Sequence, residues 1–347
     1  MNPVSANRER GVDLAKAAAI LGVIIIHTCA PGSFPIGSLD WVSAVFWSSI
    51  TRASVPIFFL CSGVLFLNPQ KELPIRKLYF RYILRIAVAL FFWAYAYKLY
   101  DLLVGGTLSL GALVQAAKEV LLFKHEFHLY FLHIILLFYA MLPIVRCFVL
   151  HAGRAELRYA LILWFTVGIL YPTLRPFWPF SLLSGIPSQW LLNQCYAAMG
   201  YGLLGFYLKR YGISLRAGIL FAIAGFAFVF GGTIGMSLYT GAFYAGFLEG
   251  MTVGPALLAV GEFGIFLHAS GHLRGNGAVA ISHLSKASFC IYLVHIFVLN
   301  LFTHFGMTAH AFLPVFSIPL VSLCNLGISL CGYFVLSKIP VVKRWLI

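Results

Sequence analysis

Charged side chains are scarce in this chain. They make up 10% of its 347 residues, against about 25% in soluble domains. Basic residues outnumber acidic ones by 24 to 10. The sequence has no HExxH, CxxC, Walker A or GxGxxG pattern, so it gives no support for a metal, nucleotide-hydrolysis or dinucleotide site. The seven cysteines lack zinc-like spacing and are expected to be small buried side chains.

Apolar side chains dominate the remaining composition. Hydrophobic residues make up 61% of the chain, and its mean hydropathy is +0.93. This composition predicts an all-α, polytopic transmembrane helical bundle with about ten spans of about 20 residues. The net charge of +14 does not indicate nucleic acid, because the basic residues cluster between apolar spans. Residues 1–347 contain no linker and are expected to form one domain.

The apolar segments predict ten helices. They cover residues 12–30, 43–67, 79–103, 128–149, 157–175, 193–210, 214–233, 242–268, 284–303 and 312–336. The longer connections 104–127 and 176–192 are expected to carry interfacial or re-entrant helices. Because Asp13 and Lys16 interrupt the first apolar run, we expect an uncleaved signal anchor rather than a cleaved signal peptide.

Basic residues lie mostly at one set of helix ends. This set comprises Arg8, Arg10, Lys71, Arg76, Lys77, Arg81, Arg85, Arg146, Arg154, Arg158, Lys209, Arg210, Arg216, Arg274, Lys286, Lys338, Lys343 and Arg344. The opposite ends hold Lys98, Lys118, Lys124 and Arg175. Because positively charged loops remain in the cytoplasm, both termini are expected there, with His27 in the outer half of its helix.

The first predicted helix contains Lys16 and His27, eleven residues apart. An α-helix turns about 100° and rises about 1.5 Å per residue, so the two lie on nearly the same face, about 16 Å apart. Asp13 lies one turn before Lys16 on that face. Ionisable groups within a membrane usually face a protein interior or a watery cavity, so these residues indicate a functional path.

A basic cluster opens the third predicted helix. Lys77, Arg81 and Arg85 follow one another at four-residue spacing and share a face. They are either an ordinary positive-inside anchor or an anion site. Guanidinium groups on one face suit phosphate or pyrophosphate, which is the functional interpretation.

The second predicted helix combines Arg52, Pro56 and Ser62. Pro56 frees a backbone carbonyl near Arg52. The segment is either a structural kink or a substrate-lining stretch. Glu249 is the only acidic residue well inside a later predicted span, and its partner is either Arg52 or a histidine.

Two further groups combine histidine with tyrosine. His128 and Tyr130 open the fourth predicted helix, either as aromatic-belt residues or as part of a site. One stripe of the ninth predicted helix carries Ser285, Ser288, Tyr292 and His295. That stripe either ties helices together by hydrogen bonds or lines a polar channel, with His295 opposite His27.

Taken in order along nearly the whole chain, these groups resemble the acyltransferase 3 family of integral membrane enzymes that acylate carbohydrates. The matching elements are Asp13 with Lys16 and His27; Arg52-x-Ser-Val-Pro-Ile-Phe-Phe-x-x-Ser-Gly; Arg81 with Arg85; His128-Leu-Tyr-Phe-Leu with Tyr139 and Pro143; and Ser285-x-x-Ser-x-x-x-Tyr-x-x-His295. The chain is most similar to the short, stand-alone members of the type that O-acetylates enterobacterial common antigen. It has Lys16 where Arg is commoner and Tyr130 where Trp is commoner.

The resemblance implies an O-acetyltransferase of the bacterial inner membrane. Its donor would be cytoplasmic acetyl-CoA, its acceptor a carbohydrate or glycolipid, and neither a metal nor nucleic acid would take part. The implied CoA phosphate site is Lys77, Arg81 and Arg85, with Lys16 as a further candidate. The other implied roles are a general base at His27, an Asp13 that positions or neutralises Lys16, and oxyanion stabilisation by Arg52, Tyr292 or His295. The residues expected to line the substrate site are Ser62, His128, Tyr130, Glu249, Ser288 and Tyr292. Direct transfer and a transient acyl-histidine both remain open.

The alternative is a transporter or flippase for a glycolipid or a small anion. Intramembrane charges would then line a translocation path. The sequence shows no inverted repeat and no paired interrupted helices, which disfavours this alternative. Five polar groups within the predicted spans also disfavour a non-catalytic membrane scaffold.

Overall fold

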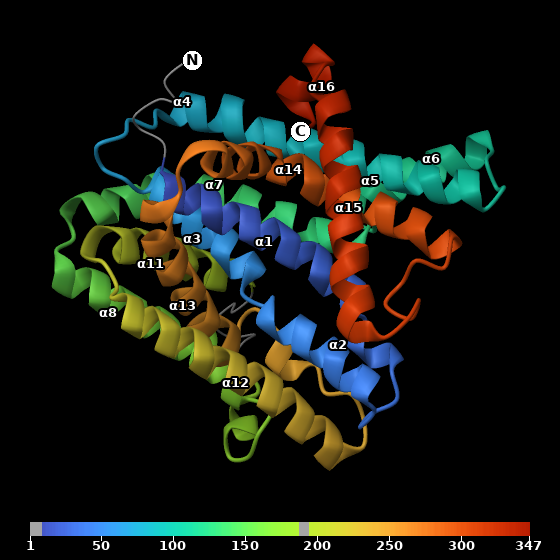
Figure 1. Ribbon diagram of the computed structural model, residues 1–347. Coiled ribbons are helices and arrows are strands. Elements are labelled where there is room, and N and C mark those ends of the chain that lie inside the picture. Colours follow the sequence, from blue (N-terminus) through green and yellow to red (C-terminus); the bar gives the residue numbers. More distant parts are fainter. Residues whose placement is uncertain (1–8, 187–193) are drawn as a thin grey trace.

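The computed structural model describes residues 9–186 and 194–347, and in these ranges all regular structure is helical (Figure 1). The long helices are α1 Arg10–Cys29, α2 Leu39–Ile50, α3 Ser54–Phe66, α5 Leu84–Val104, α6 Leu110–Leu121, α7 Tyr130–His151, α8 Arg154–Phe165, α11 Gln194–Tyr211, α12 Leu215–Thr240, α13 Val253–Ala269, α14 Gly275–His304 and α15 Pro314–Leu336. Within the described ranges, nine candidate spans are long and apolar enough to cross a membrane. The predicted all-α polytopic bundle is confirmed.

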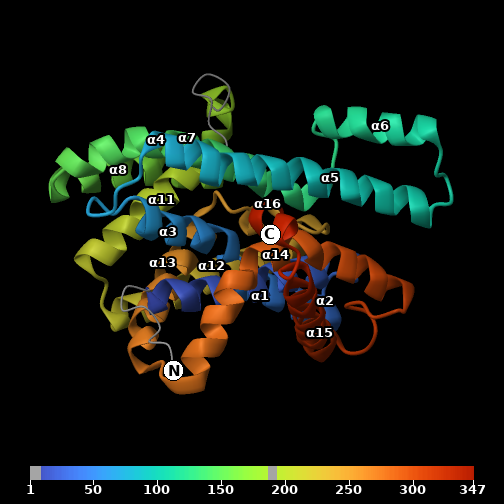
Figure 2. The ribbon, with the colours of Figure 1, turned by 90° about the horizontal axis from the view of Figure 1, so that it is seen from above.

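Eight of the ten predicted helices agree with the structure apart from their ends. The predicted helix 193–210 corresponds to α11, although residue 193 lies outside the described part. The helix α14 begins nine residues before its predicted start at 284. The connection 104–127 carries α6, and Figure 2 shows α6 beside the C-terminal part of α5, projecting beyond the bundle. The connection 176–192 carries the short 3₁₀ helix η5 Phe180–Leu183, and its last six residues lie outside the described part.

Two predicted spans are interrupted in the described residues. The predicted helix 43–67 is divided into α2 and α3 by a turn at 51–53, which contains Arg52. The predicted helix 242–268 is divided into the 3₁₀ helix η6 Gly246–Leu248 and α13, and Glu249 lies in the break. The expectation of uninterrupted helices at these two places is therefore wrong.

Side chains satisfy the backbone at the second break. The hydroxyl of Thr252 donates to the oxygen of Glu249 at 2.7 Å, and that of Tyr201 donates to the oxygen of Gly250 at 2.9 Å. The hydroxyl of Thr173 accepts from the Val253 N–H at 2.9 Å. Non-helical backbone at membrane depth is tolerated where protein groups satisfy it in this way.

Glycines let several helices cross with their backbones in contact. A Cβ atom added at Gly63 in α3 would lie 1.8 Å from the oxygen of Gly202 in α11, and one at Gly205 would lie 2.2 Å from the oxygen of Leu60. Small residues at helix crossings are typical of membrane bundles, where close van der Waals packing drives association. This crossing fixes α11 against α3, and both helices supply lining residues to the cavity described below.

The basic helix ends gather on one side of the bundle. Lys209 at the end of α11 forms an ion pair with Glu9 at 2.6 Å, just before α1 begins. Arg10 donates to the oxygen of Leu273, in the connection between α13 and α14, at 3.3 Å. This grouping agrees with the charge pattern, and the assignment of this side to the cytoplasm stays a prediction.

The cysteines fit the expectation in part. Cys29, Cys61 and Cys290 are buried free thiols, whereas Cys147 in α7 and Cys324 and Cys331 in α15 are exposed. An exposed position on an apolar helix is open to lipid, so burial in the protein was the wrong expectation for these three. Cys195, which was also expected to be buried, has a side chain outside the described part.

Candidate active site

A cavity of about 400 Å³, here called the histidine cavity, lies where α1, α3, α7 and α14 meet. Six residues predicted from the sequence line it: His27, Arg52, His128, Tyr130, Glu249 and Tyr292. The rest of the lining is largely apolar and aromatic. A largely apolar pocket with a few convergent polar groups is the usual form of a small-molecule site.

Three imidazoles lie together at this cavity. The ring centroid of His27 is 5.3 Å from that of His295 and 6.5 Å from that of His128, and the last two are 5.4 Å apart. His295 is fully buried and does not line the cavity but packs behind His27. In the described part of the chain, no group of three or more His, Cys, Asp or Glu residues has an arrangement that could hold a metal ion.

Hydrogen bonds hold the imidazole of His295 and the backbone of His128. His295 Nδ1 lies 2.7 Å from the backbone oxygen of Tyr292. A carbonyl can only accept, so Nδ1 carries the proton and, in the neutral ring, Nε2 is left as an acceptor. The hydroxyl of Tyr292 donates to the backbone oxygen of His128. The Nε2 atom of His295 and both ring nitrogens of His128 are buried without a hydrogen-bond partner. Of these two residues, only His128 lines the cavity, where its ring could meet a hydroxyl-bearing ligand.

Arg52 and Glu249 reach the histidine cavity from the two helix breaks. The Nε atom of Arg52 donates to the backbone oxygen of Leu248, at the end of η6, which links the two interrupted spans. Both side chains line the cavity. The sequence left the partner of Glu249 open between Arg52 and a histidine, and the structure places it in the cavity with both.

A second cavity of about 280 Å³, the lysine cavity, is lined by Lys16, which lies on the same face of α1 as His27. It is lined by the predicted residues Lys16, Ser62, Arg85, Ser288 and Tyr292. Asp13 lies just behind it, and its Oδ1 atom accepts from the hydroxyl of Ser285 at 2.6 Å. Ser285 of the α14 stripe thus contacts α1, and Ser285 and Ser288 line the cavity, so this stripe both ties helices together and lines a cavity.

A third cavity of about 800 Å³, the basic cavity, contains the predicted cluster Lys77, Arg81 and Arg85. The helix that carries these three residues contains a wider, π-helical segment, η2 Leu78–Ile83, between the short helix α4 Ile75–Lys77 and α5. A π turn is wider than an α turn, so the four-residue spacing no longer superimposes the three side chains. They still reach one cavity.

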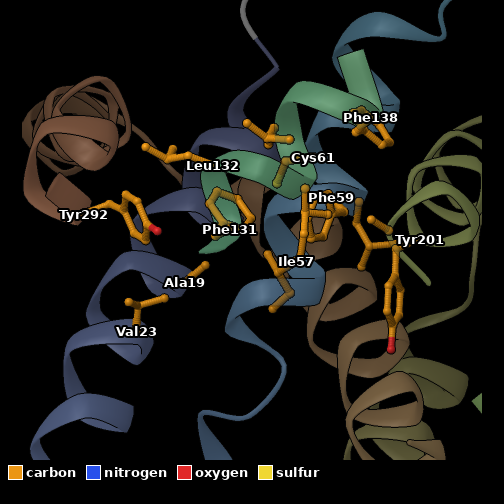
Figure 3. Packing of buried hydrophobic residues seen from close by; sticks show 14 of the residues in the cluster. Ala19, Val23, Ile57, Phe59, Cys61, Phe131, Leu132, Phe138, Tyr201 and Tyr292 are labelled. Atoms are coloured by element: carbon orange, nitrogen blue, oxygen red, sulfur yellow. The ribbon is translucent and has the colours of Figure 1, made fainter. Parts of the chain in front are cut away.

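The three cavities form a series because neighbours share lining residues. Tyr82 and Arg85 line both the basic and the lysine cavity. Phe131 and Tyr292 line both the lysine and the histidine cavity, and their ring centroids are 5.4 Å apart. Figure 3 shows these two rings side by side, and their planes are inclined by 60° in an edge-to-face contact. We call this pair the aromatic wall.

Sequence reasoning missed several residues of these cavities. Phe131 gives no signal, because an aromatic residue in a span is ordinarily buried core. Tyr201 could be found only through its contact with the break at Gly250. Arg344 and Trp345 line the basic cavity from the far end of the chain. Their basic and aromatic character was visible, but their proximity to Lys77 was not.

Comparison with known proteins gives one finding. A family model described as an acyltransferase domain, of the acyltransferase 3 type, matches residues 9–337. No curated protein and no solved structure matches the chain. The matched range begins before α1 and ends after α15, so it contains the histidine cavity and the lysine cavity in full.

Proposed function

The chain belongs to the acyltransferase 3 family and is a multi-pass membrane acyltransferase, and from that premise we propose the reaction that it catalyses. It transfers an acetyl group from acetyl-CoA to a hydroxyl of a cell-surface glycan or its lipid-linked precursor, in the bacterial inner membrane. The observation that carries the proposal is the series of cavities from the basic cluster to His27.

The series suits a donor with a charged head and a long neutral arm. The CoA phosphates bind at the basic cavity, where Lys77 and Arg81 supply charge. The pantetheine arm passes through the lysine cavity, and the thioester reaches His27 beyond the aromatic wall. Along α1, Lys16 and His27 are about 16 Å apart, which an extended arm of this kind spans.

His27 is the general base of the proposed reaction. Imidazole suits the role because its unperturbed pKa is about 6.5. It takes the proton from the acceptor hydroxyl, whose oxygen attacks the thioester carbonyl. The tetrahedral oxyanion then collapses, the C–S bond breaks, and the CoA sulfur leaves with the proton from the imidazolium. Of the groups expected to stabilise the oxyanion, Arg52 is the cation that lines the cavity.

The test compares the purified wild-type protein with two histidine variants in nanodiscs. His27→Gln is expected to lower acetyl transfer from radiolabelled acetyl-CoA to a glycolipid extract by about 10²–10⁴-fold. The matched control is His272→Gln, since His272 is exposed and lines none of the three cavities. Full transfer by folded His27→Gln would refute the assignment of the base.

The paired helix breaks favour one other function. Interrupted helices that meet at membrane depth are typical of transporters, and the expectation that the chain has no such pair is wrong. A transporter of a glycolipid or small anion would move its substrate unmodified. Acetylated product together with release of free CoA therefore supports the acyltransferase, and movement of unmodified substrate without CoA release supports the transporter.

A further inference from the structure

The basic cavity is built from two segments that are far apart in the sequence. One is the stretch from Pro74 to Arg85. The other is the short helix α16 Pro340–Trp345, which supplies Arg344 and Trp345. Five of the nine lining residues are cationic, and in the described part of the chain none of the nine is acidic. Such a cluster is repulsive until an anion binds.

Residues 340–347 are docked against α5 by two hydrogen bonds. The indole Nε1 of Trp93 donates to the oxygen of Leu346 at 2.9 Å, and a guanidinium nitrogen of Arg85 donates to the oxygen of Ile347. Leu346 and Ile347 are 8% and 5% exposed. Arg85, expected to bind phosphate, is therefore partly committed to holding this segment in place.

The docked segment supplies one more cation, Arg344, to the basic cavity. The guanidinium of Arg344 lies over the ring of Trp345, 5.2 Å from its centroid, and both residues line the cavity. A guanidinium fork matches phosphate oxygens by paired, charge-assisted hydrogen bonds. Trp345, with Phe80 and Tyr82, supplies aromatic surface, on which nucleobases stack. Cations and aromatic rings in one cavity suit a nucleotide better than a free phosphate.

We propose that residues 340–347 complete the donor site, with Arg344 binding phosphate and Trp345 packing against the adenine of the CoA nucleotide. The inference rests on the proposed function, since acetyl-CoA is the donor assigned there. It adds a binding element from the end of the described chain. The phosphate of an anionic lipid headgroup shares this chemistry, so the experiment must separate the two sources.

The test uses two adjacent variants of the full-length protein in detergent. Arg344→Gln and Lys343→Gln each remove one positive charge from α16, and both side chains are exposed. Lys343 does not line the cavity, so it is the matched control. Arg344→Gln is expected to raise the Kd of CoA about tenfold or more, and Lys343→Gln less than about twofold.

A truncated donor supplies the second readout. S-acetylpantetheine lacks the nucleotide, so its turnover is expected to be equal in the wild type and both variants. Arg344→Lys keeps the charge without the fork and is expected to recover part of the CoA affinity. Equal Kd changes in Arg344→Gln and Lys343→Gln would overturn the proposal, because they would show that only the overall positive charge of α16 matters and not a direct contact between Arg344 and CoA. So would Arg344→Gln weakening the binding of phosphatidylglycerol while leaving CoA binding unchanged, which would assign the cavity to lipid.

Failure of this inference is separable from failure of the proposed function. If the wild type turns over acetyl-CoA but the two Gln variants behave alike, the role of Arg344 is wrong and the acetyltransferase assignment stands. If the wild type neither binds nor turns over acetyl-CoA, the proposed function fails, and the inference fails with it.

Discussion

Replacing Tyr292 with Phe tests whether the aromatic wall separates donor from acceptor. The Tyr292 ring stays in place in this variant, but its hydroxyl no longer donates to the backbone oxygen of His128. The wall is then held less firmly to the segment that carries His128. We expect more frequent opening between the lysine and histidine cavities, and therefore more hydrolysis of acetyl-CoA when no acceptor is present.

The size of the effect follows from the contacts of that oxygen. Both partners are buried, Tyr292 at 7% exposed and His128 at 1%. The His128 oxygen also accepts from the backbone N–H of Tyr130, so Tyr292→Phe does not leave it wholly unpaired. The loss is thus expected in the lower range for hydrogen bonds in membrane proteins, about 0.6–1 kcal/mol. This corresponds to about a three- to fivefold rise in opening and in hydrolysis.

The assay measures CoA release and acetyl transfer from the same sample. Tyr97→Phe is the control. The Tyr97 hydroxyl is also buried and donates at 2.9 Å to the oxygen of Leu293, which lies in α14 next to Tyr292. Tyr97 lines neither cavity. A rise in hydrolysis with Tyr292→Phe and not with Tyr97→Phe supports the wall. If Tyr292→Phe lowers hydrolysis and transfer together, its hydroxyl acts on the reaction itself and the reasoning is wrong.

The remaining predictions concern packing and positioning. Gly205→Ala is expected to lower thermal stability, because its Cβ would meet the oxygen of Leu60, whereas Gly231→Ala, with nothing within 4 Å, is expected to be neutral or stabilising by up to about 1 kcal/mol; equal melting temperatures would contradict the close crossing. Asn325 donates to the oxygen of His295 at 2.9 Å, so Asn325→Leu is expected to lower kcat about threefold with little change in KM. A change in KM alone would show that this bond does not position His295.

Helical periodicity and charge predicted much of the site. The pair Lys16 and His27 could be placed on one face because a span is regular there, and both line cavities in the same series. Hydropathy could not predict the breaks, since it measures apolar character and not backbone hydrogen bonding. The break at Arg52 depends on the distant oxygen of Leu248, and only the folded chain shows that partner.

The aromatic wall has a consequence for the electrical insulation of the membrane. A unit charge that crosses a potential of 100 mV changes its energy by about 2.3 kcal/mol. A continuous water-filled path through the protein would therefore let ions leak down their gradient. The apolar ring of Phe131 and the ring of Tyr292 stand between two cavities that both contain polar groups. For a donor with its charge at one end, such a pair admits the uncharged end, while the phosphates stay on the cationic side. In the proposed reaction, the acyl group would therefore pass from donor to acceptor while the membrane potential is maintained.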